Sequence, residues 1–485
     1  MPSKNSKVVK GTIWSLLDVT SRQSISFILN IILARLLFPS DYGIIGVVLI
    51  FTSFADVIAD GGLSVALIRK IDRTIEDEST AFYINILIGV FLYISIFALS
   101  PFIASFFNIP DLNLVIRITS VSIIFNSCSI VQNSILISDM RLGVITKMGV
   151  IIQVSSGIIA VVLAYAGMGV WALVVQIILS SFLKMVILWF VTKWMPQLYF
   201  CYKSFSYLWS FGSKLLLSNV IGTIYDRIYS FLIGKKVGNV QLGLYTRADS
   251  LASQGPSIVN ATLAKVLIPY LKSYIEDKKQ LQERYMEVVE VASFLIFPIM
   301  ILLISISKPL FLFLFGERWM EAVPIFRIIC FGYAWGPFTI ISLQLLQTLG
   351  DSKYFLKLEI FKKIIQTLII LLAFQFGFWG IVVAQPFYFI IGTLINLSIA
   401  HKYLGSSYFS ELISILKYLM ASLPIIIVGY FVNDLNLHAI YEIIMITIVG
   451  ILLYLAIILV FKFPALLFVK KVCKSNFKMK RIYNK

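Results

Sequence analysis

Charged side chains stand inside several long apolar segments of this 485-residue chain. A charge at the centre of a bilayer costs about 3 kcal/mol or more, so such residues usually face water or a partner charge. Arginine in particular can bind a phosphate group through two parallel hydrogen bonds. The cations of these segments therefore predict a wet cavity on a transport path. The alternative is that some of them pair with nearby acids in a purely structural role. The candidates are Arg22, Arg117, Lys214, Arg227, Arg247, Lys265 and Arg327.

Acidic side chains lie in the same segments and are candidates for ion coupling. A carboxylate in a low-dielectric cavity can hold a proton or bind Na⁺, which would couple transport to an ion gradient. The simpler alternative is that the acids balance the nearby cations, and nothing in the spacing fixes a proton relay. The acids are Asp18, Asp56, Asp60, Asp226 and Asp249.

Two Gly-Pro pairs interrupt long apolar segments and are candidate hinges. Gly255-Pro256 and Gly336-Pro337 fall near the middle of their segments. Proline removes a backbone hydrogen bond and kinks a helix, leaving carbonyl groups that can face a cavity. The alternative is an ordinary kink, since proline is common in transmembrane helices.

The elements that position these residues are predicted to be about fourteen transmembrane helices in an all-α, polytopic membrane protein. Hydrophobic residues make up 59% of the chain, and each apolar segment is close to the roughly 20 residues that span a bilayer. The polar gaps are short, which leaves no room for a separate soluble domain. The expected spans are 12–37, 43–68, 80–107, 114–137, 144–166, 169–192, 207–233, 242–270, 288–315, 322–349, 355–376, 380–401, 411–431 and 439–461.

The net charge of +17 comes from lysines and arginines that gather in alternate loops. This bias is typical of cytoplasmic loops, so both termini are expected to be cytoplasmic. It explains the basic composition without a nucleic-acid partner. The basic C-terminal tail is expected to contact anionic membrane lipids, and segment 272–284 is expected to form a short surface helix on the membrane.

The chain also repeats itself at an offset of about 200 residues. Ala34-Arg35 followed by Gly43 is matched by Gly234-Lys235 followed by Gly243, and Arg117 is matched by Arg327. These echoes predict two six-helix lobes of the same orientation, a known transporter architecture. We expect an N-terminal lobe over 1–200, a second lobe over 201–403, and an extra helix pair with a basic tail over 404–485.

Sequence signatures of catalysis are missing. The chain has no phosphate-binding GxxxxGK[ST] loop and no GxSxG or HExxH motif. The four cysteines are isolated, which predicts neither a metal site nor a disulfide framework. His401 and His438 fall at the ends of predicted spans on opposite sides. We therefore expect no cofactor, no metal and no enzymatic activity.

Three segments resemble the polysaccharide-transporter (Wzx-like) flippases of the multidrug/oligosaccharidyl-lipid/polysaccharide exporter superfamily. They are KGTIWS at 10–15, ARLLFPSDYG at 34–43 and DGGL at 60–63. The resemblance implies alternating-access transport of an undecaprenyl-diphosphate-linked oligosaccharide across the bacterial cytoplasmic membrane. That cargo would be an O-antigen, capsule or exopolysaccharide repeat unit, and the partners would include a polysaccharide polymerase and chain-length machinery.

Four alternatives stay open at this point. A flippase for lipid II, the peptidoglycan precursor, would also bind a diphosphate, and that subfamily too has spans outside the repeat. A drug/cation antiporter is expected to carry net acid in its cavity. A membrane-embedded polysaccharide polymerase is expected to have a large outward loop, and the outward gaps here are short. An acyltransferase is expected to carry a catalytic histidine deep within a span.

Overall fold

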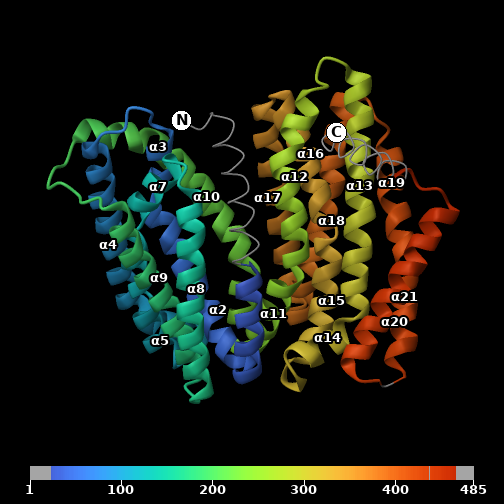
Figure 1. The fold of residues 1–485 in the computed structure, drawn as a ribbon, viewed down its shortest axis with the longest axis horizontal. Coiled ribbons are helices and arrows are strands. Elements are labelled where there is room, and N and C mark those ends of the chain that lie inside the picture. Colours follow the sequence, from blue (N-terminus) through green and yellow to red (C-terminus); the bar gives the residue numbers. More distant parts are fainter. Residues whose placement is uncertain (1–22, 436, 466–485) are drawn as a thin grey trace, which may run out of the picture. The chain divides into compact units, whose positions relative to one another are not determined.

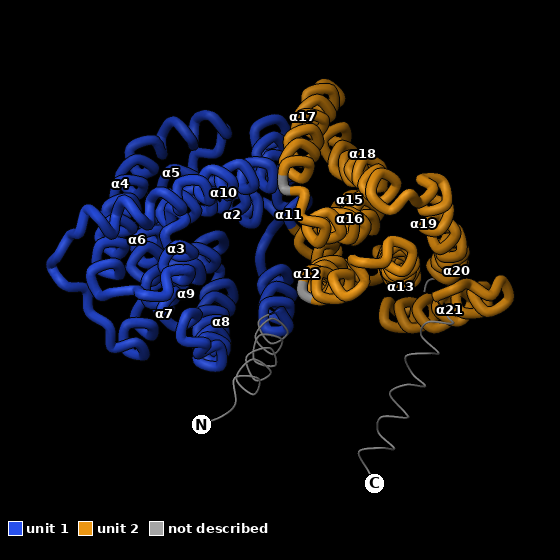
Figure 2. The backbone as a smooth tube through the Cα atoms, turned by 90° about the horizontal axis from the view of Figure 1, so that it is seen from above, with its two compact units in different colours: residues 1–246 blue, residues 247–485 orange. Residues whose placement is uncertain are grey.

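The computed structural model describes residues 23–435 and 437–465, which are helical with no strand among them (Figure 1). The all-α class predicted from the sequence is confirmed. The chain divides into two compact units, residues 1–246 and 247–485, coloured separately in Figure 2. The boundary falls inside one helix, α11. The lobe boundaries expected near residues 200 and 403 stay a prediction.

Unit 1 begins, within the described residues, with a short apolar helix, Gln23–Leu36. Helix α2 then begins at Pro39, whose fixed backbone angle suits the first turn. The start of α4 is capped by Thr74, whose hydroxyl accepts from the Asp77 amide while the Asp77 carboxylate accepts from the Thr74 amide. The unit contains α2 (Pro39–Asp60), α3 (Leu63–Arg69), α4 (Ile75–Phe107), α5 (Leu112–Thr119), α6 (Val121–Ser127), α7 (Ile130–Ser138), α8 (Leu142–Tyr165), α9 (Val170–Thr192), α10 (Tyr202–Lys236) and the start of α11 (Asn239–Ala252).

Glycines let helices of unit 1 touch backbone to backbone. Gly62 has φ +70° in the turn between α2 and α3, and a Cβ there would overlap the carbonyl oxygen of Gly212 on α10. A Cβ at Gly43 would overlap the carbonyl oxygen of Asn239, and one at Gly243 would overlap that of Pro39. The two repeat-related glycines thus fix the crossing of the starts of α2 and α11.

Unit 2 contains the remaining helices and ends with the pair outside the repeat. Its core forms where α12, α13, α15, α16 and α18 pack on one another. Its elements after α11 are α12 (Gln254–Lys272), α13 (Lys278–Ser305), α14 (Ser307–Leu314), the 3₁₀ turn η1 (Glu317–Trp319), α15 (Ala322–Tyr333), α16 (Gly336–Leu349), α17 (Ser352–Gln375), α18 (Gly377–Leu404), α19 (Tyr408–Ser422), α20 (Pro424–Asn433) and α21 (Ala439–Val460).

Buried acids attach the C-terminal helices to α13. The Glu290 carboxylate forms an ion pair with Lys417 of α19 at 2.5 Å and accepts a hydrogen bond from the Tyr418 hydroxyl at 2.5 Å. Glu411 accepts from the hydroxyl of Tyr285 at 2.6 Å. A buried charge needs such partners, so these contacts specify where α19 docks on α13.

Ten helices among the described residues are long and apolar enough to cross a membrane. They correspond to ten of the fourteen expected spans. Three of the other four coincide with the more polar α10, α11–α12 and α17, and the first lies partly outside the described residues. The count of fourteen therefore stays a prediction.

The separate surface helix expected over 272–284 is wrong. Helix α12 continues to Lys272 and α13 begins at Lys278, so a short turn joins them. Asp277 caps α13 by accepting hydrogen bonds from the amides of Lys279 and Gln280. This cap marks the start of α13, so the charged residues after Asp277 form the first turns of the long helix.

The segments that carry the two paired arginines are both broken. The segment with Arg117 is interrupted at Ser120 and again at Cys128-Ser129, and the segment with Arg327 is interrupted at Ala334-Trp335. The breaks do not fall at equivalent distances from the two arginines, so the division into two matching lobes stays a prediction.

Candidate functional site

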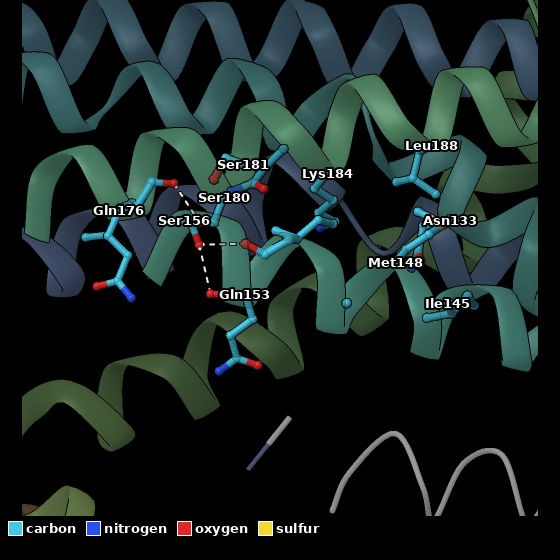
Figure 3. A pocket seen from close by; sticks show the side chains of 14 residues that line it. Asn133, Ile145, Met148, Gln153, Ser156, Gln176, Ser180, Ser181, Lys184 and Leu188 are labelled. Atoms are coloured by element: carbon cyan, nitrogen blue, oxygen red, sulfur yellow. Dashed lines mark hydrogen bonds between the residues drawn. The ribbon is translucent and has the colours of Figure 1, made fainter. Parts of the chain in front are cut away.

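A polar cavity of about 430 Å³ lies within unit 1. Helices α6, α7, α8 and α9 line it, and all four belong to membrane-length segments with a mean hydropathy of 1.8 or above. Its polar lining consists of Asn126, Asn133, Gln153, Ser156, Gln176, Ser180, Ser181 and Lys184 (Figure 3). A polar cavity among apolar helices costs stability unless water or a ligand fills it, so this cavity is the leading candidate site.

Asp56 lies next to this cavity and ties α2 to it. The Asn126 side-chain amide donates to both oxygens of the Asp56 carboxylate, at 3.2 and 3.4 Å. Lys184 of α9 is close enough for its positive charge to attract the same carboxylate. Three helices of unit 1 thus bring an acid, an amide and a cation together.

Unit 2 builds a related cluster around Asp249. The Asp249 carboxylate accepts from the Tyr333 hydroxyl at 2.9 Å and from the Gln385 side-chain amide at 3.2 Å. These partners come from α15 and α18, the repeat counterparts of the α5–α7 and α9 segments. Each unit therefore holds one acid of its second repeat helix with polar groups from the fourth and sixth.

Arg117 and Arg327 occupy matching positions and make matching contacts. Arg117 Nε donates to the Ser100 hydroxyl at 2.6 Å, and Arg327 Nε donates to the Ser307 hydroxyl at 2.6 Å. The Arg117 guanidinium also lies 4.5 Å from the centre of the Phe97 ring. The repeat predicted from Arg117 and Arg327 is thus reproduced in their side-chain geometry.

The serine hydroxyl that accepts from each arginine also lies within hydrogen-bond distance of a backbone carbonyl of its own segment. Ser100 lies 2.8 Å from two acceptors, the Phe97 carbonyl and the Asn113 side-chain oxygen, and its one proton can go to either. Ser307 donates to the Ile304 carbonyl at 2.7 Å. Pro101 follows Ser100 inside α4 and cannot donate to the Phe97 carbonyl as an ordinary residue would. The arginine-serine pair therefore has a structural task, which leaves the outer guanidinium nitrogens as the part that could meet a ligand.

Arg247 is buried against aromatic rings in unit 2. It is 5% exposed, and its guanidinium lies 4.6 Å from the centre of the Phe315 ring and 5.8 Å from that of Trp319. Such contacts stabilise a desolvated cation by about 2 kcal/mol. This favours a packing role for Arg247 over cavity lining.

Three further candidates lie on the central part of α10. Lys214 and Asp226 are exposed and Arg227 is half-buried, whereas both ends of α10 are packed into unit 1. Asp60 is separate from them: it ends α2, and its carboxylate accepts hydrogen bonds from Ser64 at the start of α3.

The remaining candidates differ in what the structure describes. Arg22 and Asp18 lie outside the described residues, and the Lys265 side chain is not described. Helix α11 ends at Ala252 and α12 begins at Gln254, one residue before Gly255-Pro256. Gly336-Pro337 begins α16, and the carbonyl of Trp335 just before it accepts from the Thr393 hydroxyl at 3.1 Å. Whether either break acts as a hinge stays a prediction.

Lys184 and the cavity amides were missed by sequence reasoning. Lys184 was recognisable, because it is the one charge inside the apolar 23-residue stretch that forms α9. Gln153 and Gln176 were not, since isolated amides in apolar helices give no pattern that places them on a shared cavity wall.

The family model described as "Polysaccharide biosynthesis protein" matches residues 32–324. The chain is 26% identical to the succinoglycan biosynthesis transport protein ExoT of Rhizobium meliloti (strain 1021), over 68% of this chain and 67% of that protein. It is 22% identical to the lipopolysaccharide biosynthesis protein WzxC of Escherichia coli (strain K12), over 88% of both.

The fold resembles that of the lipid II flippase MurJ in its inward closed conformation. The TM-score is 0.72 at 15% identity, over 93% of this chain and 98% of that one. At this identity the likeness establishes the fold, which includes the helix pair after the repeat. With the family match over more than half its length, the resemblance seen in the sequence is confirmed: the chain is a multi-pass membrane protein that belongs to the polysaccharide biosynthesis protein family.

Proposed function

We propose that this protein is a flippase that moves an undecaprenyl-diphosphate-linked oligosaccharide across the bacterial cytoplasmic membrane by alternating access. Its cargo is an O-antigen, capsule or exopolysaccharide repeat unit. The named relatives, a succinoglycan transport protein and a lipopolysaccharide biosynthesis protein, support a glycan cargo. The MurJ-like fold supports a lipid-linked one.

The observation that carries this proposal is the polar cavity inside unit 1. Membrane-length apolar helices have no structural need for eight polar side chains around a cavity of about 430 Å³. A transporter of a hydroxyl-rich head group does need such a surface, because the head group must exchange its water for protein hydrogen bonds. Carrying this head group through the membrane explains the cavity without a catalytic residue.

The experiment is deletion of the gene in its own host, followed by analysis of surface glycan and of lipid-linked intermediates. We expect surface glycan to be lost and the lipid-linked repeat unit to accumulate on the cytoplasmic face. Expression of the intact protein from a plasmid should restore export. Normal surface glycan in the deletion strain would contradict the proposal.

Lipid II is the second candidate cargo, and the similarity to MurJ over 93% of the chain favours it. The two cargoes share the diphosphate and differ in the sugars. Depletion of the host's own lipid II flippase separates them, since a second lipid II flippase would sustain growth. Growth arrest in the presence of this protein would exclude lipid II as its main cargo.

Ion coupling, orientation and partners form the finer part of the proposal. Asp56 and Asp249 are the candidate ion carriers, since each is held by polar groups of two other helices. Both termini are placed in the cytoplasm, as the loop charges indicate. A polysaccharide polymerase and chain-length machinery would use the exported repeat unit.

A further inference from the structure

The cavity of unit 1 offers hydrogen-bonding groups that the described protein does not use. The side-chain amides of Asn133, Gln153 and Gln176 form no hydrogen bond with the described part of the chain. Gln153 of α8 and Gln176 of α9 both line the cavity, and their amides point to the same side in Figure 3. Each amide presents a donor and an acceptor at a fixed separation.

The cavity hydroxyls add acceptors to this surface. Ser156 donates to the Ile152 carbonyl at 2.8 Å, and Ser180 donates to the Ile177 carbonyl at 2.9 Å. Their protons are thus engaged, while their lone pairs can still accept from a ligand. A ligand that fits must both donate and accept several times, as neighbouring hydroxyls of a sugar ring do.

Other ligand classes fit the lining less well. None of the described residues that line the cavity is aromatic, which disfavours a planar apolar drug. A lipid tail would leave the amides without partners in a low-dielectric site. A diphosphate calls for several cations, whereas Lys184 is the one charged side chain among the described lining residues.

Lys184 adds a preference for one negative charge. The Asp56 carboxylate attracts Lys184, and Asn126 donates to both Asp56 oxygens. Asn126 can therefore keep Asp56 hydrogen-bonded when the Lys184 ammonium turns to a ligand. Lys184 can therefore pair with the carboxylate of a ligand while the Asp56 carboxylate keeps its hydrogen bonds from Asn126.

We propose that this cavity is a sugar subsite that holds a pyranose residue of the cargo, with Lys184 pairing with the carboxylate of an acidic sugar. The amides of Gln153 and Gln176 hold the ring hydroxyls. A volume of about 430 Å³ is in the range of small-molecule sites. The inference rests on the proposed function and names the class of glycan that the protein selects.

The binding test uses the full-length protein in lipid nanodiscs with two probes, methyl β-glucuronide and methyl β-glucoside, measured by saturation-transfer NMR. Lys184→Met should weaken glucuronide binding about tenfold and leave glucoside binding within about twofold. Gln153→Ala with Gln176→Ala should weaken both. Lys203→Met, on the exposed start of α10, is the matched control and should change neither. Thermal unfolding checks that each variant is folded.

Equal binding of the two probes by the intact protein, or an unchanged glucuronide affinity in Lys184→Met, would overturn the subsite. Stronger displacement of glucuronide by inorganic phosphate than by glucuronate would reassign the site to phosphate and also overturn the carboxylate assignment. A folded Gln153→Ala/Gln176→Ala variant with unchanged glucoside binding would remove the sugar-ring assignment.

A cell test separates this inference from the proposed function. Two strains make lipid-linked repeat units that differ only in an acidic or a neutral sugar. Lys184→Met should reduce export of the acidic unit about tenfold and spare the neutral one. If the intact protein exports both units and Lys184→Met reduces the export of both equally, the subsite is wrong and the proposed function stands. No export of either unit by the intact protein would sink the proposed function.

Discussion

Arg117 and Arg327, two of the charged residues inside apolar segments, are each held by a hydrogen bond from Nε, the inner nitrogen of the guanidinium group. In both units the arginine Nε donates to a serine hydroxyl that lies within hydrogen-bond distance of a backbone carbonyl, and in unit 1 also of the Asn113 side-chain oxygen. This arrangement explains why a cation at this position is tolerated in an apolar helix, whether or not a ligand meets its outer nitrogens. It also shows that location in a span does not by itself identify a ligand-binding residue.

Removing the serine should therefore loosen the fold. Ser100→Ala is expected to lower stability by about 1 kcal/mol, because Arg117 loses its acceptor and the Phe97 carbonyl and the Asn113 side chain lose the hydroxyl donor they share. Combining it with Arg117→Gln should add little further loss, as expected for a shared interaction. Thermal unfolding in detergent measures both. Ser95→Ala is the control, since Ser95 is half-buried on the same helix and its hydroxyl donates to the Phe91 carbonyl of its own helix.

If the losses of stability in Ser100→Ala and Arg117→Gln simply add up in the double variant, the two residues do not share an interaction and the assignment is wrong. A Ser95→Ala variant as unstable as Ser100→Ala would contradict it as well. The equivalent pair in unit 2, Ser307 and Arg327, makes the same type of hydrogen bond. We expect the corresponding variants there to lose a similar amount of stability.

At the scale of helices, the crossing of α2 and α11 depends on two glycines. Gly43→Ala is expected to destabilise the protein by about 1–3 kcal/mol, because the new methyl group overlaps the Asn239 carbonyl. Gly222→Ala on α10 is the matched control, since no atom lies within 4 Å of a Cβ there. Gly222→Ala should be neutral or slightly stabilising. Comparable loss in both variants would mean that helix propensity, not the crossing, sets the cost.

The sequence predicted these helices better than it predicted their contacts. Ten expected spans recur as membrane-length helices, because apolar length is a local property. The repeat signals at Gly43, Gly243, Arg117 and Arg327 were also readable. The cavity was not, since Gln153 and Gln176 become neighbours only when α8 packs on α9. The surface helix expected over 272–284 does not form, because Asp277 caps the start of α13 within this segment and the residues after it join the long helix.

At the scale of the whole molecule, the acids held in each unit raise the question of what drives transport. If Asp56 or Asp249 carries an ion, collapse of the proton or sodium gradient should slow glycan export several-fold. Cells treated with an ionophore specific for each gradient, followed by pulse-labelling of surface glycan, measure this. Export that is indifferent to both ionophores would remove ion coupling and leave the two acids a structural role.

The arginine-serine contact is duplicated in the two units, while Lys184 and its amides lie on α8 and α9 and their neighbours. The residues that stabilise the fold are thus different from the residues that we propose bind the sugar. Exchanging residues 142–192 between two relatives with different glycans should transfer cargo preference while the recipient still folds. New surface polysaccharides could then arise by replacing one short hairpin, which would let closely related bacteria diversify their coats without rebuilding the exporter.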